Sequence, residues 1–259
     1  SALFGGAWWV APSAYFIGVA AIIISGIMLK KTKMFAGDPA PFVMELPAYH
    51  LPTVGNVLRS MWERGSSFIK RAGTVILLSS IIIWAGSSFG MTDGSFGFNP
   101  DVDLENSVLG MIGGAISWIF APLGFDNIRA TIATIMGLVA KEEVVAVFGV
   151  LDFEGMTRLS AYSFMIFNLL CAPCFAAIGA IKREMNNAKW TWFAIGYQCI
   201  FAYTMALMVY QFGLLFTGAG FGVGTVAALI VLIAYIWLLF RKGYDENGAR
   251  LRAASAVRS

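Results

Sequence analysis

Long apolar runs recur through the chain and restrict it to folds that can be built in a lipid bilayer. Residues from Trp8 to Leu29 form a 22-residue run without a charge, which is long enough for a helix to cross about 30 Å of hydrocarbon. Hydrophobic residues make up 58% of the 259 residues and charged residues only 13%, about half the charged share of a soluble domain. The sequence therefore predicts an all-α fold, a polytopic helical membrane protein.

The apolar runs divide the chain into about five spans and a less regular region. The predicted spans are residues 8–29, 73–89, 162–181, 190–212 and 221–240. Residues 108–150 contain two apolar pieces, one short and one interrupted by charges, which predict a re-entrant or broken hairpin or a pair of short spans. Residues 56–71 separate apolar from basic side chains and predict an amphipathic helix on the cytoplasmic surface. The polar residues 241–259 predict a cytoplasmic tail.

The basic residues indicate how the spans are oriented. They follow three of the predicted spans, at Lys30, Lys31 and Lys33, at Lys182 and Arg183, and at Arg241 and Lys242. The loop after residue 89 is acidic and holds no Lys or Arg before Arg129. Because basic loops stay in the cytoplasm, we expect the N-terminus outside and the C-terminus inside. The net charge of +3 is too small to suggest a nucleic-acid partner.

Two polar interruptions lie inside the apolar sequence. One is Lys141-Glu142-Glu143, within the run from 137 to 148, and the other is Cys171-Ala-Pro-Cys174, within the run from 162 to 181. Charges and helix-breaking prolines are costly in hydrocarbon and usually have a function there. Thiols and carboxylates that meet at membrane depth suit a cation path. The first hypothesis is therefore an ion or solute transporter and not an enzyme.

The two cysteines of the second interruption allow three interpretations. In a helix, their spacing places both thiols on one face, and Pro173 removes a backbone donor and frees the carbonyl of Leu169. Freed carbonyls beside thiols suit a metal ion, Fe²⁺ among them. Packing of small apolar side chains and a redox pair remain open. Cys199, alone in an aromatic run, is expected to be a packing residue.

The first interruption and a nearby amide complete the candidate site. Adjacent carboxylates on a helix point about 100° apart, so Glu142 and Glu143 both face one site only if the helix is unwound. Lys141 would neutralise one of them. A cation ligand or proton acceptor is one interpretation, and a structural ion pair or an interfacial turn is the other. Asn168 is either a helper ligand or an interhelical hydrogen-bonding residue.

Four motifs, in matching order over roughly residues 1–240, resemble the membrane region of ferrous iron transport protein B. Two of them are the stretch 44–53, Met-Glu-Leu-Pro-Ala-Tyr-His-Leu-Pro-Thr, and Met61-Trp-Glu-Arg64 with Lys70-Arg-Ala-Gly-Thr-Val-Ile76. The stretch 137–145, Gly-Leu-Val-Ala-Lys-Glu-Glu-Val-Val, is similar to the family's second gate region. Pro173-Cys174 with residues 176–184 is similar to its Pro-Cys gate helix.

The resemblance implies that residues 1–240 are the C-terminal half of a membrane domain that imports Fe²⁺ across the bacterial inner membrane. Cys174 would then be a thiol ligand, Glu142 or Glu143 a carboxylate ligand or gate, and Pro173 and Lys141 parts of the gate pattern. Cys171 carries less weight. Fe²⁺ would be the transported ion, with no firmly bound cofactor, and GTP would act only through a GTPase domain that this chain lacks.

The implied partners are the lipid bilayer, the first gate repeat and GTPase domain of a full transporter, and small accessory proteins of the same iron system. A homo-oligomer stays open, and no nucleic acid is expected. Three alternatives remain: a nucleoside-type gate transporter, a membrane thiol-redox protein using Cys171 and Cys174, and a non-transporting scaffold subunit.

Overall fold

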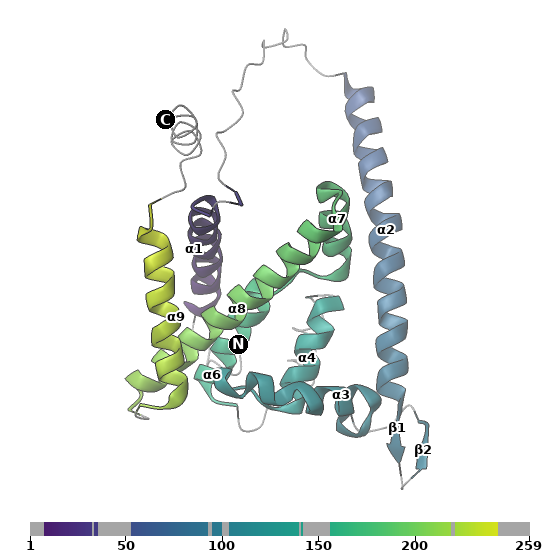
Figure 1. The fold of residues 1–259 in the computed structure, drawn as a ribbon. Coiled ribbons are helices and arrows are strands. Elements are labelled where there is room, and N and C mark those ends of the chain that lie inside the picture. The colour runs from purple at the N-terminus through teal and green to yellow at the C-terminus, as the bar shows by residue number, and fades with distance from the viewer. Residues whose placement is uncertain are drawn as a thin grey trace, which may run out of the picture.

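A computed structural model describes residues 8–32, 34–35, 53–92, 95–99, 104–139, 141, 156–218 and 221–242. Most of these residues are helical (Figure 1), so the predicted all-α class is confirmed. The helices are α1 (Val10–Lys30), α2 (Val54–Ser88), η1 (Leu104–Asn106), α3 (Val108–Ser117), η2 (Trp118–Leu123), α4 (Ile128–Val139), α6 (Arg158–Leu170), α7 (Phe175–Met185), α8 (Ala188–Phe216) and α9 (Val223–Phe240), where η marks 3₁₀ turns. The strands β1 (Phe89–Thr92) and β2 (Ser95–Phe98) form a small hairpin.

Three helices in the described part are long and apolar enough to cross a membrane. They are Pro12–Lys30 within α1, all of α8 and all of α9, and they lie where the sequence predicts spans over 8–29, 190–212 and 221–240. The pair formed by α3 with η2 and by α4 is bent by 99°, as in a broken span or a re-entrant loop. This bent pair occupies the described part of the region 108–150, where the sequence predicts a broken hairpin or two short spans.

Helix α2 corrects the prediction of two separate elements over 56–71 and 73–89. It runs without a break for 35 residues, about 52 Å at the α-helical rise. The expected boundary at Gly73 is absent, because a lone glycine weakens a helix by only about 1 kcal/mol and leaves its hydrogen-bond ladder intact. The amphipathic segment therefore continues the axis of the second apolar segment (Figure 1) and is not a separate surface helix.

The prediction of one continuous span over 162–181 is also corrected. The segment is two helices, since α6 ends at Leu170 and α7 begins at Phe175. Pro173 explains the break, because it cannot supply the N–H that the carbonyl of Leu169 would accept in a continuing helix. The four residues between the helices, Cys171 to Cys174, are not helical.

The hairpin at the end of α2 is not predicted from the sequence. Its antiparallel strands pair Phe89 with Phe98 and Thr92 with Ser95, and the rings of Phe89 and Phe98 lie 5.3 Å apart. The two residues between the strands are Asp93 and Gly94, a dipeptide that favours two-residue hairpin turns. That dipeptide, between two short segments that contain phenylalanine, was the available signal.

The core lies where η2, α4, α6 and α8 meet, and four phenylalanine rings form its centre. The ring of Phe125 lies 5.2 Å from Phe120, 5.2 Å from Phe164 and 5.9 Å from Phe167. All four side chains are buried, and Ala202 and Ala206 of α8 pack against the same cluster. This cluster fixes α6 against α8 and so holds the end of α6 in place.

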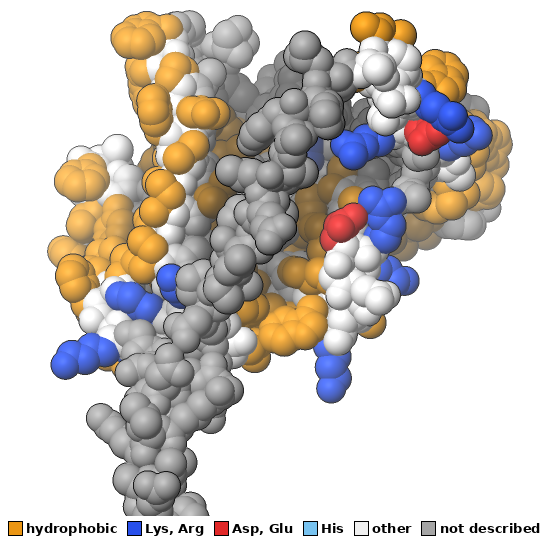
Figure 2. Space-filling model, turned by 90° about the horizontal axis from the view of Figure 1, so that it is seen from above, with side chains coloured by type: hydrophobic (Ala, Val, Ile, Leu, Met, Phe, Trp, Pro, Cys, Tyr) orange, Lys and Arg blue, Asp and Glu red, His pale blue; other side chains and the backbone are white. Residues whose placement is uncertain are grey.

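The basic helix ends gather at one end of the molecule. The end of α1, the start of α2, the junction of α7 and α8 and the end of α9 all lie toward the top of Figure 1, whereas the hairpin and α3 lie at the bottom. Figure 2 looks onto the upper end and shows Lys and Arg side chains spread across it. Described basic residues of these helix ends are Lys30, Lys31, Arg59, Arg64, Lys70, Lys182, Arg183, Lys189, Arg241 and Lys242.

Candidate functional site at the break between α6 and α7

The break leaves backbone carbonyls without helical partners. The N–H of Cys171 still donates to the carbonyl of Phe167 at 2.8 Å and closes the last turn of α6. The backbone of Cys171 is then extended, with φ −60° and ψ 167°. The carbonyls of Asn168 and Leu169 consequently lose the donors that residues 172 and 173 would supply in a continuing helix. Such carbonyls form the negative end of the helix dipole and attract a cation.

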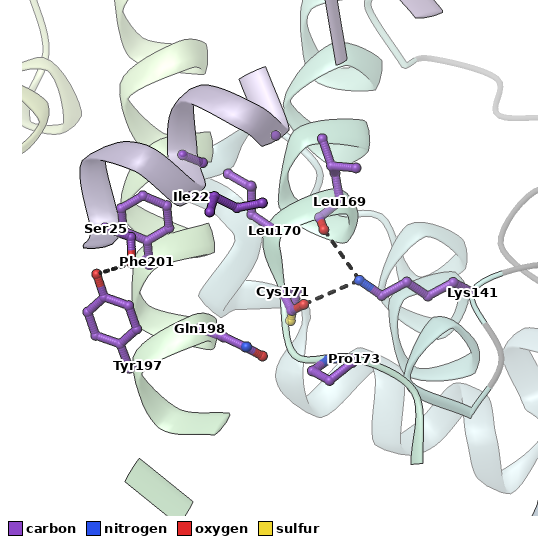
Figure 3. A pocket seen from close by; sticks show the side chains of 12 residues that line it. Ile22, Ser25, Lys141, Leu169, Leu170, Cys171, Pro173, Tyr197, Gln198 and Phe201 are labelled. Carbon is purple, nitrogen blue, oxygen red and sulfur yellow. Dashed lines mark hydrogen bonds between the residues drawn. The ribbon is translucent and has the colours of Figure 1, made fainter. Parts of the chain in front are cut away.

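The ammonium group of Lys141 occupies this position (Figure 3). Its Nζ lies 2.9 Å from the carbonyl oxygen of Asn168, 3.4 Å from that of Leu169 and 3.3 Å from that of Cys171. The thiols of Cys171 and Cys174 are also close enough to interact with its charge. Lys141 is half-buried, and no carboxylate in the described ranges lies within ion-pair distance of it.

A cavity of about 390 Å³ opens beside the break, between α1 and α8. Its lining residues are Gly18, Ala21, Ile22, Ser25, Lys141, Leu169, Leu170, Cys171, Pro173, Tyr197, Gln198 and Phe201. The hydroxyls of Ser25 and Tyr197 are hydrogen-bonded to each other at 2.8 Å. The Oε1 atom of Gln198 is buried and has no hydrogen-bond partner within the described structure. The cavity therefore combines apolar walls with an ammonium, a thiol and one unpaired acceptor.

The thiols are arranged differently from the sequence prediction. Cys171 and Cys174 do not share a helix face, because neither lies inside a helix. Cys171 instead lies opposite Cys199 of α8, with 3.9 Å between the two Sγ atoms, so the packing contact of Cys199 is with a cysteine of the break. Cys171 lines the cavity, whereas Cys174 caps the N-terminus of α7 outside that lining. All three cysteines are free and half-buried.

The remaining predicted residues have mixed outcomes. The side-chain amide of Asn168 donates to the carbonyl of Phe164 at 3.0 Å, a bond within its own helix and not the interhelical bond expected. Its contribution to the site is its backbone carbonyl. Pro173 lines the cavity. Glu142 and Glu143 lie outside the described residues. In the part of the chain that is described, no three His, Cys, Asp or Glu side chains gather into a metal-binding group.

Gln198 lines the cavity and is not predicted from the sequence as a site residue, and Cys199, expected only to pack, lies against Cys171 of the site. They are adjacent in the apolar run of α8, and a polar residue inside a membrane span is by default a candidate for function. This pair was therefore visible in the sequence. The side chains that this pair contacts could not be predicted, because the break after α6 lies about 28 residues away along the chain.

Two family models match the chain. Residues 11–64 match the model described as the C terminus of ferrous iron transport protein B. Residues 69–188 match the Gate model, described as nucleoside recognition. The second match contains Lys141, the break and all of α7.

Curated relatives from bacteria and an archaeon support the same assignment. An Fe(2+) transporter FeoB of Staphylococcus aureus is 34% identical over 218 residues, which cover 80% of this chain and 32% of the relative. An Fe(2+) transporter FeoB of Methanocaldococcus jannaschii is 35% identical over 231 residues, which cover 82% of this chain and 34% of the relative. A fusion of Fe(2+) transport protein A with FeoB from Porphyromonas gingivalis is 30% identical over 256 residues, which cover 78% of this chain and 30% of the fusion protein. The chain thus spans about a third of each relative's length. No solved structure matches it.

Proposed function

Because this chain belongs to the ferrous iron transport protein B family, we propose that it forms the C-terminal part of the membrane domain of a permease that imports Fe²⁺. The permease would lie in the inner, or plasma, membrane. The parts of the transporter beyond these 259 residues would supply a first gate repeat and a GTPase domain, through which GTP acts on this part.

The broken helix is the observation that carries the proposal. Discontinuous membrane helices bind transported ions, because their half-helix ends expose carbonyls and dipole charge at membrane depth. Here the end of α6 exposes such carbonyls next to the thiol of Cys171 and beside a cavity of about 390 Å³. Fe²⁺ accepts oxygen and sulfur ligands. A few weak ligands of both kinds let an ion bind and leave again.

Within this site we assign one thiol contact to Cys174, because the family's Pro-Cys pattern falls on it, and a second to Cys171, which lines the cavity. Both interact electrostatically with Lys141. A carboxylate of Glu142 or Glu143, next to Lys141 in the chain, would add a charged oxygen ligand and neutralise part of the ion's charge in hydrocarbon. Pro173 has a structural part, since it keeps α6 from continuing and thereby keeps the Leu169 carbonyl out of the helical hydrogen-bond ladder.

The basic end of the molecule supports an orientation. The ends of α1 and α9, the start of α2 and the junction of α7 with α8 carry Lys and Arg on the same side (Figures 1 and 2). By the positive-inside rule, this side is the cytoplasmic one. The N-terminal end of α1 is then outside and the C-terminal end of α9 is inside. The Porphyromonas gingivalis fusion suggests that the accessory partner is a protein like Fe(2+) transport protein A.

Uptake of radioactive Fe²⁺ by cells that lack their own ferrous permease tests the proposal. The chain is produced together with the remaining two thirds of a FeoB transporter, as the unaltered chain and with Cys174→Ser or Glu142→Gln. We expect uptake that requires both parts and falls at least about tenfold in these variants. Asp126→Asn, an exposed carboxylate between η2 and α4, is the matched control and keeps full uptake. Full uptake in folded Cys174→Ser and Glu142→Gln proteins would remove the ion path from this break.

A nucleoside transporter is the second candidate, because the matched Gate model is described as nucleoside recognition and the cavity has the size of a small-ligand pocket. Its lining offers few free polar groups, since Ser25 and Tyr197 bond to each other. Uptake of labelled nucleoside by the same cells separates the two functions. Nucleoside uptake without Fe²⁺ uptake would replace the iron proposal.

A further inference from the structure

Lys141 satisfies the end of α6 in the way that a metal ion would. An ammonium has three donors and no acceptor, and Nζ of Lys141 has three carbonyl acceptors, from Asn168, Leu169 and Cys171. These oxygens converge on one point because the chain turns out of the helix at Cys171. Convergent backbone carbonyls are the ligands with which membrane proteins replace the hydration shell of a cation.

One acceptor that lines the neighbouring cavity, on Gln198, has no hydrogen-bond partner in the described structure. Gln198 projects from α8 into the cavity, and its amide faces the side on which Cys171 lies (Figure 3). Its Oε1 atom is buried and unpaired within the described structure, which is costly unless a donor or a cation arrives. The thiol of Cys171 lines the same cavity. A cation that replaced the ammonium would therefore lie beside a cavity whose lining also includes an amide side chain and a thiol.

We infer that the carbonyls of Asn168, Leu169 and Cys171 form a cation-binding site which Lys141 occupies as a tethered cation. Lys141 is then a built-in competitor. An incoming divalent cation binds only when the ammonium leaves, and the ammonium returns when the ion moves on. The flexible four-carbon stem of lysine allows this movement. The inference deepens the proposed function and rests on it only for the identity of the transported ion.

The competition has a simple electrostatic basis. An ammonium and a divalent ion cannot share three carbonyls, because like charges a few ångströms apart repel strongly where water is scarce. Removing the lysine charge should therefore raise the affinity of the site for a divalent cation. Restoring the missing backbone donor should remove the site, because the Leu169 carbonyl would again accept a helical hydrogen bond.

Binding of Mn²⁺ to the purified chain in lipid nanodiscs, followed by the electron paramagnetic resonance signal of free Mn²⁺, tests this inference. Mn²⁺ prefers oxygen ligands. We expect Lys141→Met to bind Mn²⁺ at least about tenfold more tightly than the unaltered chain. Lys141→Arg keeps the charge and should bind as weakly as the unaltered chain. Methylammonium, a free analogue of the lysine head group, should compete with Mn²⁺ in Lys141→Met.

The double variant Lys141→Met with Pro173→Ala tests whether the added Mn²⁺ affinity comes from the carbonyls at the break. It should lose the added affinity, since an alanine at this position supplies the backbone N–H donor that Pro173 lacks. Equal Mn²⁺ affinity of the unaltered chain and a folded Lys141→Met variant would overturn the inference. An equal gain in Lys141→Arg, or a gain that survives Pro173→Ala, would overturn it as well.

A measurement on the unaltered chain covers the case in which Lys141→Met does not fold. Saturating Mn²⁺ should speed reductive methylation of Lys141 at least about threefold, because a displaced ammonium is more accessible. Mass spectrometry follows the reaction, with the exposed Lys189 as the internal reference. An unchanged ratio of the two rates would contradict displacement.

These results are separable from those of the uptake experiment. Tighter Mn²⁺ binding by Lys141→Met together with a complete lack of Fe²⁺ uptake would retain the cation site and reject the iron permease. Uptake that depends on Cys174, combined with Mn²⁺ binding that is indifferent to Lys141, would retain the permease and reject the tethered cation.

Discussion

The Sγ atoms of Cys171 and Cys199 lie 3.9 Å apart and connect the end of α6 to the middle of α8. Cys174, only three residues from Cys171 in the chain, is not the thiol that Cys171 contacts. The break explains this arrangement, because the extended backbone at Cys171 ends the helical spacing that would bring positions 171 and 174 onto one face.

The first prediction concerns oxidation of this pair. Diamide should form a Cys171–Cys199 disulfide, because the two sulfurs need to approach by only about 2 Å to reach bonding distance. Mass spectrometry of peptides from the non-reduced protein identifies the linked pair. Cys199→Ser should abolish the cross-link and leave Cys171 free. A disulfide between Cys171 and Cys174 as the main product would contradict the structure and favour the redox-pair hypothesis.

The sequence predicts the chemistry of the break better than its geometry. The loss of the Leu169 donor follows from Pro173 alone, and the structure has that carbonyl in contact with a cation. The cation itself is not predicted, because Lys141 lies 27 residues before Asn168 and the packing of α4 against α6 decides which side chains meet. The same limit explains Cys199, whose partner is set by how α8 crosses α6.

Elements are predictable where composition alone decides them. The spans over 8–29, 190–212 and 221–240 are uncharged apolar runs, and helices are present at each of them. The boundary expected near Gly73 is wrong because a change from basic to apolar side chains alters the environment of a helix without breaking its backbone. The strands β1 and β2 are missed because four-residue strands carry almost no periodic signal.

The second prediction tests the turn between η2 and α4. Gly124 has φ +83°, and a Cβ there would lie 2.1 Å from Cε2 of Tyr210. Gly124→Ala should lower the free energy of unfolding by about 3 kcal/mol, from backbone strain together with overpacking. Gly218 has the same φ with open space around it, so Gly218→Ala should cost only about 1 kcal/mol.

Unfolding in mixed micelles measures both glycine variants. The difference between them isolates the contact with Tyr210, because the backbone penalty is common to both. Equal losses of stability would show that Tyr210 moves aside without cost and that the close approach is not a constraint on the fold.

The third prediction concerns the aromatic core. Phe125 is 1% exposed and contacts three other rings, so Phe125→Ala should destabilise the protein by about 3 to 5 kcal/mol. Phe216 is 90% exposed, so Phe216→Ala is the matched control. It should change the free energy of unfolding by less than about 0.5 kcal/mol. Thermal unfolding in detergent measures both, and similar losses would mean that the cluster does not hold α6 against α8.

The fourth prediction tests the orientation of the helices. Asp126→Cys, in the exposed connection between η2 and α4, and Ala188→Cys, at the exposed start of α8, are made in a protein whose three cysteines are serine. The two positions belong to opposite ends of the molecule (Figure 1). If the basic end is cytoplasmic, a membrane-impermeant maleimide should label residue 126 on intact spheroplasts and residue 188 only on inverted vesicles.

Labelling in the opposite sense would invert the topology and place the basic helix ends outside. Labelling of both positions from one side would mean that the helices between them do not carry the chain across the bilayer. Permeabilised membranes provide the control, since both cysteines must react there. A cysteine that is labelled neither on intact spheroplasts nor on inverted vesicles, and reacts only after the membranes are permeabilised, lies in hydrocarbon. That outcome would move the membrane boundary past the end of the helix concerned.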